Sequence, residues 1–113
     1  MKNQVFLTRR LVLEEAVRLP DGAGGFSETW SELGTVWADI RPTGSRQRAG
    51  DAAVLSLVSY RIIVRAAPDG SPRRPKAGQR FRDGARRFRI EAVTERPGSV
   101  MFLDCRASEE VAS

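Results

Sequence analysis

The chain has 113 residues and a mass of 12.5 kDa, and 41% of its residues are hydrophobic. This is the usual size of one independently folding domain, and no segment approaches the roughly 20 apolar residues of a membrane-spanning helix. The single cysteine excludes an internal disulfide, and the lack of histidine excludes imidazole catalysis and the commonest zinc sites. With no secretory signal pattern at the N-terminus, we expect one soluble, cytoplasmic domain over residues 1–113 that uses no metal or cofactor.

Positive charge is concentrated in one segment. Nineteen Lys and Arg oppose 14 Asp and Glu, which gives a net charge of +5. Residues 73–89 hold eight basic residues and one acid, a local net of +7, whereas the remaining 11 basic and 13 acidic residues sum to −2. The basic residues are Arg73, Arg74, Lys76, Arg80, Arg82, Arg86, Arg87 and Arg89. Arginines of this kind either contact a phosphate backbone or an acidic partner, or keep an exposed sheet face soluble.

Alternating apolar and polar residues predict strands along most of the chain. The predicted strands are residues 9–17, 26–33, 35–41, 54–64, 79–82, 86–93 and 99–106. Six or seven short strands with turn residues between them, and no long helical pattern, predict an all-β fold. We expect a small barrel or sandwich of short antiparallel strands, with a long loop between the second and third main strands.

Glycine and proline set the expected breaks between strands. Gly34 interrupts the second strand pattern, and Pro42 ends the next one because proline cannot donate to a strand ladder. The polar residues 43–53 therefore predict the long loop. Asp83 and Gly84 form a hairpin turn. Residues 107–113 are polar, and we expect a flexible tail there.

The side chains of chemical interest suggest assembly rather than catalysis. The adjacent acids at 14–15 and 109–110 are interpreted as solvated surface charge, because neighbouring strand residues point to opposite faces. Cys105 has no histidine to activate it and is expected to be buried in a strand. Trp30, Trp37 and Tyr60 are candidates for the core or for a subunit interface. The chain is therefore not expected to be an enzyme.

Several segments in order resemble the phage head–tail joining proteins, also called head-closure or stopper proteins, of tailed phages, prophages and gene transfer agents. The similar segments are residues 9–14, 21–30, 36–42, 60–65, 86–90 and 103–106. The most specific part is Gly24-Gly25 with Thr29-Trp30, followed by Val-Trp-Ala-x-Ile-x-Pro at residues 36–42.

The resemblance implies a β-barrel in the head–tail neck of a virion or phage-like particle, assembled in the bacterial cytoplasm. Copies would form a ring under a portal or adaptor protein, retain packaged double-stranded DNA and present a docking surface to a tail terminator or tail protein. The loop at residues 41–54 would line the DNA channel through Arg41, Arg46, Gln47 and Arg48. No membrane is implied.

A second interpretation stays open on the residues alone. The basic residues 73–89 could make the domain a free-standing nucleic-acid-binding β-barrel. Such a module would bind DNA as a monomer with a steep dependence on salt, whereas a stopper would bind free DNA weakly and act only when assembled.

Overall fold

The chain folds into six antiparallel strands, with no helix across residues 4–49 and 54–112, the part of the chain that the computed structural model describes. The strands are β1 (Arg9–Pro20), β2 (Phe26–Ala49), β3 (Val54–Arg65), β4 (Arg80–Asp83), β5 (Arg86–Glu95) and β6 (Phe102–Ala112). The all-β prediction is confirmed. In those same ranges, nothing helical is long and apolar enough to cross a bilayer.

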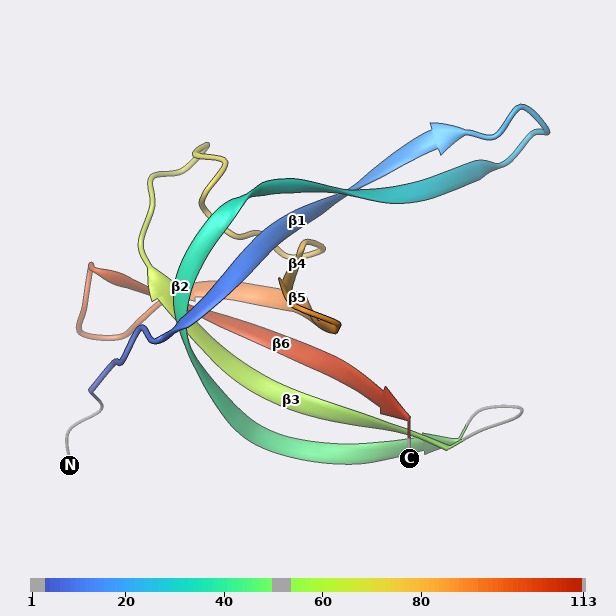
Figure 1. The fold of residues 1–113 in the computed structure, drawn as a ribbon. Helices are drawn as coiled ribbons and strands as arrows, with labels where there is room; N and C mark the ends of the chain where they lie inside the picture. Colours follow the sequence, from blue (N-terminus) through green and yellow to red (C-terminus); the bar gives the residue numbers. More distant parts are fainter. Residues whose placement is uncertain (1–3, 50–53, 113) are drawn as a thin grey trace.

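The six strands form one sheet that closes on itself. Their order around the barrel is β1-β2-β3-β6-β5-β4, and the short strand β4 pairs back onto β1 (Figure 1). This closing contact spans three residue pairs: Val12 with Arg82, Leu13 with Phe81 and Glu14 with Arg80. Because the ring is complete, the strands in its body have no unpaired edge.

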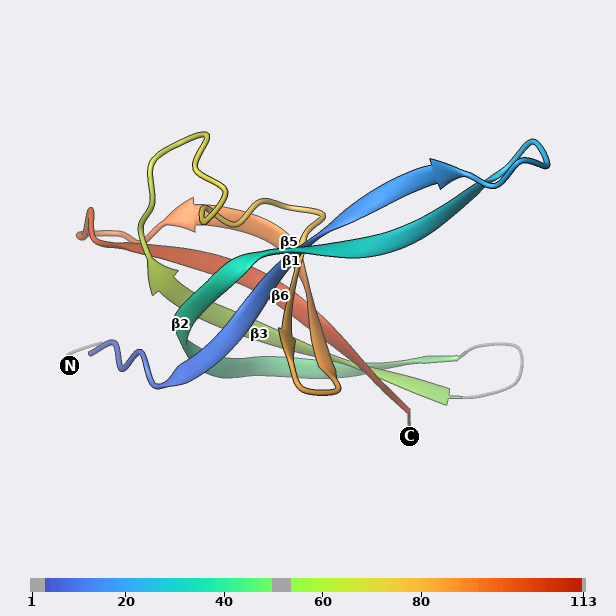
Figure 2. The same cartoon turned by 45° about the horizontal axis from the view of Figure 1, so that its top comes forward.

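Two hairpins extend beyond the closed part of the sheet. β1 pairs with β4 only at residues 12–14, so residues 15–20 pair with β2 alone and form a projecting ribbon, the β1–β2 arm (residues 15–32). The end of β2 and the start of β3 form the β2–β3 arm (residues 43–49 and 54–59), and β6 pairs with the other edge of β3 along it. Both arms leave the barrel on the same side, the right in Figures 1 and 2, and diverge from each other.

The predicted breaks at Gly34 and Pro42 are wrong, because β2 runs unbroken from Phe26 to Ala49. The strand does not end at either place; instead, its pairing register shifts by one residue. Leu33 is an extra residue opposite the β1 step from Leu13 to Glu14, and Thr43 is an extra residue after Pro42. Gly34, with a φ of +147°, and Pro42, which has no N–H, each lie next to such an extra residue, and the strand continues through both.

The expected loop at residues 41–54 is a β-hairpin for most of its length. The β2 residues up to Ala49 pair with β3 from Val54 onward, and only residues 50–53 lie outside the described residues. The long loop between the second and third main strands is therefore corrected to an arm made of two strands.

The C-terminal prediction also needs correction. β6 continues to Ala112, where a flexible tail was expected from residue 107, and it pairs with β3 up to the contact of Leu55 with Ala112. Ala107 is fully buried and Glu109 is 8% exposed. The tail looks polar in sequence because its buried positions are occupied by an alanine and a carboxylate.

The hairpin expected around Asp83 and Gly84 is confirmed. Asp83 pairs with Arg86, so the turn consists of Gly84 and Ala85. Gly84 has a φ of +61°, which glycine adopts without the steric penalty of a side chain.

The core fills the interior of the barrel with side chains from all six strands. The buried cluster consists of Leu11, Leu13, Ala38, Tyr60, Ile62, Val64, Phe81, Phe88, Ile90, Leu103, Cys105 and Ala107. The alternation expected at residues 36–40 is confirmed, with Ala38 buried and Trp37 exposed. Ile63 lies between the outward-facing Arg61 and Arg65 in the alternation of β3, yet it is fully buried. The Phe6 amide donates to the carboxylate of Asp39, which pairs with Ile63, so the N-terminal segment lies against this row.

The burial of β6 leads to a test by truncation. A chain ending after Arg106 should lose cooperative unfolding, because it lacks Ala107 and Glu109 and leaves half of β3 without its partner on the β6 side. A chain ending after Glu110 should unfold within a few degrees of the full-length protein. Thermal unfolding followed by circular dichroism measures both, and equal stability of the two truncations would contradict the observed end of β6.

Candidate assembly surfaces

The four residues expected to line a DNA channel are on β2, not on a loop. Arg41 lies on the outer face of the barrel, where its guanidinium contacts the Asp39 carboxylate at 2.9 Å and the backbone oxygen of Gln4. The Asp39 hydrogen bond holds the pKa of Arg41 above its usual value. Arg46, Gln47 and Arg48 pair through their backbones with residues 55–57 in the β2–β3 arm, and their side chains lie outside what the structure describes.

Two arginines of the basic segment are bound to a carboxylate of β1. Arg80 Nε donates to Glu14 Oε1 at 2.6 Å, and Arg82 Nε donates to Glu14 Oε2 at 2.9 Å. Glu14 is 5% exposed, so it is buried and not the solvated charge that the sequence suggested. Burial alone raises the pKa of the Glu14 carboxyl, but the two arginine hydrogen bonds outweigh it and leave the pKa below its ordinary value.

The cluster of Glu14, Arg80 and Arg82 also includes two residues of the β1–β2 arm. Arg82 also donates to Glu32 at 2.8 Å, and the Arg80 guanidinium stacks over the Trp30 ring with 3.9 Å between Cζ and the ring centroid. Trp30 is therefore half-buried under an arginine of its own chain rather than placed in the core. The cluster attaches the base of the arm to β4.

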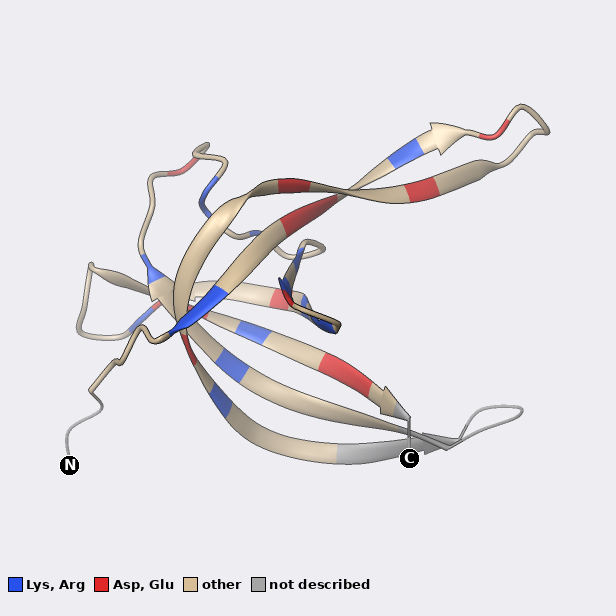
Figure 3. Cartoon of the chain, viewed as in Figure 1, with Lys and Arg blue, Asp and Glu red and all other residues tan. Residues whose placement is uncertain are grey.

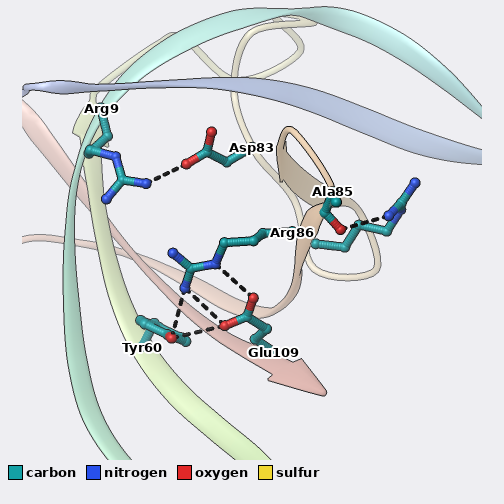
Figure 4. A network of polar contacts seen from close by, with 7 residues as sticks. Arg9, Tyr60, Asp83, Ala85, Arg86 and Glu109 are labelled. Carbon is teal, nitrogen blue, oxygen red and sulfur yellow. Dashed lines mark hydrogen bonds and ion pairs between the residues drawn. The ribbon is translucent and has the colours of Figure 1, made fainter. Parts of the chain in front are cut away.

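A second network lies near the β4–β5 turn and includes the remaining buried carboxylate. Arg86 donates to both oxygens of Glu109, at 2.9 and 3.0 Å, and to the hydroxyl oxygen of Tyr60 at 3.0 Å (Figure 4). The Tyr60 hydroxyl in turn donates to Glu109 at 2.9 Å, and its ring meets that of Phe88 edge-on. Tyr60 thus belongs to the core. Arg9 pairs with Asp83 beside this network.

Glu109 was expected to be a solvated charge, and the network explains why it is not. The hydrogen bonds from Arg86 lower the pKa of the Glu109 carboxyl below its usual range, with a further contribution from Tyr60, against the opposing effect of burial. Burial and the neighbouring carboxylate raise the pKa of Tyr60. A buried carboxylate is tolerated here because each of its oxygens accepts charged or hydroxyl donors.

The basic segment therefore does not present one continuous cationic face. Arg74 contacts Asp69 at 3.1 Å, and three further arginines of the segment pair with Glu14, Glu32 and Glu109. The other four form no ion pair within the described part of the chain: Arg73, Lys76, Arg87 and Arg89. Arg87 and Arg89 lie on β5 beside a groove of about 420 Å³ that Trp30 and Glu110 also line. Positively and negatively charged positions both occur on the strands (Figure 3).

A row of arginines on the outer face was not found by sequence reasoning. Arg41 pairs with Arg61 across β2 and β3, and Arg61 pairs with Arg106 across β3 and β6. The neighbouring row carries Asp39 and Asp104, and Arg61 lies 3.8 Å from the Asp104 carboxylate. Alternation in the sequence indicates that each arginine faces outward. Their alignment depends on the pairing register, which alternation does not supply.

The surface around Trp37 is apolar and exposed. Trp37 is 54% exposed and lines a groove of about 320 Å³ with Leu7, Val36 and residues 66–67. Arg65 and Arg73 stand at the same groove. An exposed tryptophan beside a groove is typical of a contact with another protein, as the sequence suggested for this residue.

The described side chains form no grouping typical of metal binding or nucleophilic catalysis. No three His, Cys, Asp or Glu residues come together as ligands across residues 4–49 and 54–112. Cys105 is buried as expected, and desolvation raises the pKa of its thiol to about 12, which keeps it protonated at neutral pH.

Comparison with known proteins agrees with a role in assembly. A family model described as phage head completion protein matches residues 3–110. A chain in the solved structure "Virion of native gene transfer agent (GTA) particle" is 48% identical to this one, covers 99% of this chain and 100% of that chain, and superposes with a TM-score of 0.84. No curated protein matches significantly.

These findings define the class of protein first: a structural component of a phage-type head, and thus of a virion or virion-like particle. More particularly, the chain belongs to the phage head completion protein family, whose pattern spans nearly all of it. The resemblance noted in the sequence is confirmed at this level.

The Glu109 network leads to a prediction about pH. The folded pKa of Glu109 lies below the unfolded value near 4.5, so its ionised form contributes stability fully above that value and loses it as the pH falls through the folded pKa. Glu109→Gln should lower the free energy of unfolding by roughly 1–3 kcal/mol at pH 7, since it removes charged hydrogen bonds to Arg86. The deficit should shrink below about pH 4.5.

Urea unfolding of both proteins at pH 7 and pH 3.5 measures this difference. Glu110→Gln is the matched control, because Glu110 is exposed on the same strand. A deficit for Glu109→Gln that stays constant with pH would show that the carboxylate charge is not what stabilises this end of the barrel.

Proposed function

We propose that this protein is the stopper of a head–tail neck. Copies assemble as a ring below the portal or adaptor of a filled head, retain the packaged DNA in the central channel, and provide the surface on which the tail docks. The 48% identity over the full length to a chain in a gene transfer agent virion supports a particle of that kind.

The observation that carries this proposal is the β2–β3 arm. It extends from the body of the barrel with β6 paired to the other edge of β3, and its β2 strand carries Arg46 and Arg48 (Figure 1). A ring of barrels that directs one such arm each toward its axis would surround a DNA duplex with cationic side chains. Such contacts retain DNA through its phosphates without regard to sequence.

The distribution of charge also supports a stopper over a free-standing DNA-binding module. Four of the eight basic residues at 73–89 pair with carboxylates of the same chain, so only the other four remain for contacts with a phosphate backbone. Arg41, Arg61 and Arg106 form a row across three strands of the outer face, in which Arg61 and Arg106 are exposed and Arg41 is paired with Asp39. An acidic protein surface of the adaptor or the tail would suit this row.

Electron microscopy of particles from a strain lacking this gene tests the function directly. We expect separate heads and loose tails, because the docking surface is missing. Empty heads are expected among them, because nothing retains the DNA. Normal tailed particles would contradict the stopper role, and salt-dependent binding of DNA by the purified monomer would then support the alternative module.

Charge reversal on the β2–β3 arm tests DNA retention separately. Particles carrying Arg46→Glu and Arg48→Glu should contain at least several-fold more empty heads than wild type, since two cationic contacts per subunit become repulsive. Arg87→Glu with Arg89→Glu changes the net charge equally on β5 and is the matched control. The ratio of empty to full heads is counted in micrographs. More empty heads with the β5 pair than with the arm pair would assign retention to the basic segment.

A further inference from the structure

The tip of the β1–β2 arm exposes large apolar side chains far from the barrel. Leu19 is 50% exposed and Phe26 is 61% exposed, on opposite faces of the ribbon. The Arg18 guanidinium lies 4.7 Å from the centroid of the Phe26 ring and supports it on one side. Apolar groups at the end of a hairpin gain nothing from the protein's own core, so they indicate a contact with another surface.

The turn at the tip has a defined shape. Asp21 accepts hydrogen bonds from the amides of Ala23 and Gly25, at 2.8 and 3.0 Å, and the Asp21 amide donates to the Gly25 oxygen at 3.1 Å. The two side-chain bonds lower the pKa of Asp21, so the residue stays charged. The tip is thus preorganised and loses little conformational freedom when it binds.

The groove around Trp37 has the complementary character. Its apolar floor is flanked by cationic side chains: Arg65 and Arg73 line it, and Arg10 pairs with Trp37 across β1 and β2. None of these three arginines has an ion-pair partner in the described chain.

The charges of the arm match this basic rim. Residues 15–32 hold four carboxylates, Glu15, Asp21, Glu28 and Glu32, against the one arginine Arg18, so the arm has a net charge of −3. An apolar tip with an acidic surround fits an apolar groove with a basic surround, and such complementarity fixes orientation as well as affinity.

The geometry of the chain prevents the tip from filling its own groove. Trp37 pairs with Arg10 near the start of β1, whereas the tip lies at the other end of the β1–β2 pair, where Pro20 pairs with Phe26, and the longest dimension of the molecule is 52 Å. We propose that the tip of the β1–β2 arm of one copy docks into the Trp37 groove of the next copy. The contact joins two different surfaces, so it is head-to-tail and repeats around a ring. The inference rests on the ring assembly proposed above and assigns its contact surfaces.

Cysteine cross-linking tests this contact. The natural Cys105 is fully buried with its thiol pKa near 12, so introduced cysteines are the reactive ones. Particles and purified protein carrying both Ser27→Cys at the tip and Ala67→Cys at the groove are treated with a short-spacer bismaleimide. We expect a ladder of covalent multimers at multiples of the 12.5 kDa chain. The mixture of the two single variants should give dimers only, because each copy then has one reactive surface.

The matched control combines Ser27→Cys with Ser45→Cys, an exposed position on the other arm. The proposal is overturned if this control gives the same ladder, if Ser27→Cys alone gives dimers, or if the tip cross-links in particles only to a different protein. Loss of the ladder in particles with normal heads and tails rejects the contact and leaves the stopper role intact. If purified protein gives the ladder but the strain lacking the gene forms normal particles, the contact between copies is supported and the stopper role is rejected.

A charge exchange gives a second readout. In the variant that carries Ser27→Cys and Ala67→Cys, Glu28→Arg places a cation opposite the basic rim of the groove. Because the two surfaces then repel, the yield of cross-linked multimers should fall at least tenfold. Arg65→Glu added to this variant restores the opposite signs and should recover most of the yield. Absence of recovery would show that these charges do not face each other.

Discussion

The closed barrel depends on a three-residue contact between β1 and β4, and a buried carboxylate lies at that contact. β4 is only four residues long, and its backbone pairing alone adds few hydrogen bonds. Glu14 accepts a charged hydrogen bond from each of the outward-facing arginines, Arg80 and Arg82. Phe81, which lies between them, is buried in the core. The short strand is thus held on both faces, and without it the sheet would be open at β1 and β5.

This closure and the neighbouring Glu109 network explain three of the seven arginines of the basic segment. Arg80 and Arg82 fix β4 to β1, and Arg86 fixes the β4–β5 turn to β3 and β6 through Tyr60 and Glu109. Arginine suits these positions better than lysine because its planar guanidinium reaches two acceptors at once. A segment that looks like a nucleic-acid-binding face in sequence therefore acts first as an internal clamp.

The sequence predicted the features that depend on local pattern, such as strands and turns. It did not predict the features that depend on how the strands pair with one another. The strand at residues 54–64 and the Asp83-Gly84 turn follow from alternation and turn chemistry, and both agree with the structure. The continuity of β2 through Pro42 depends on a bulge, which is a property of its pairing with β3. The burial of Glu14 and Glu109 depends on partners 66 and 23 residues away.

The candidate surfaces show the same difference between what local pattern predicts and what strand pairing determines. Trp37 was named with Trp30 and Tyr60 as a candidate for the core or for a subunit interface, and only the structure separates them, with Trp37 exposed and Tyr60 buried. The arginine row across β2, β3 and β6 was missed, since the sequence separation of its members hides that they are neighbours.

Closing the barrel restricts how the protein can assemble. A closed body offers no strand edge on which a neighbour could add a strand, so assembly has to use side-chain surfaces or the two arms. The arms are the places where strands leave the ring, and the β1–β2 arm has both of its edges free over residues 15–20 and 26–32. Both arms leave from one side of the barrel (Figures 1 and 2), whereas Trp37 pairs with Arg10 near the start of β1, at the other end of the β1–β2 pair from the tip. This polarity favours contacts between unlike surfaces, and repeated contacts of that kind form the closed ring that a head opening requires.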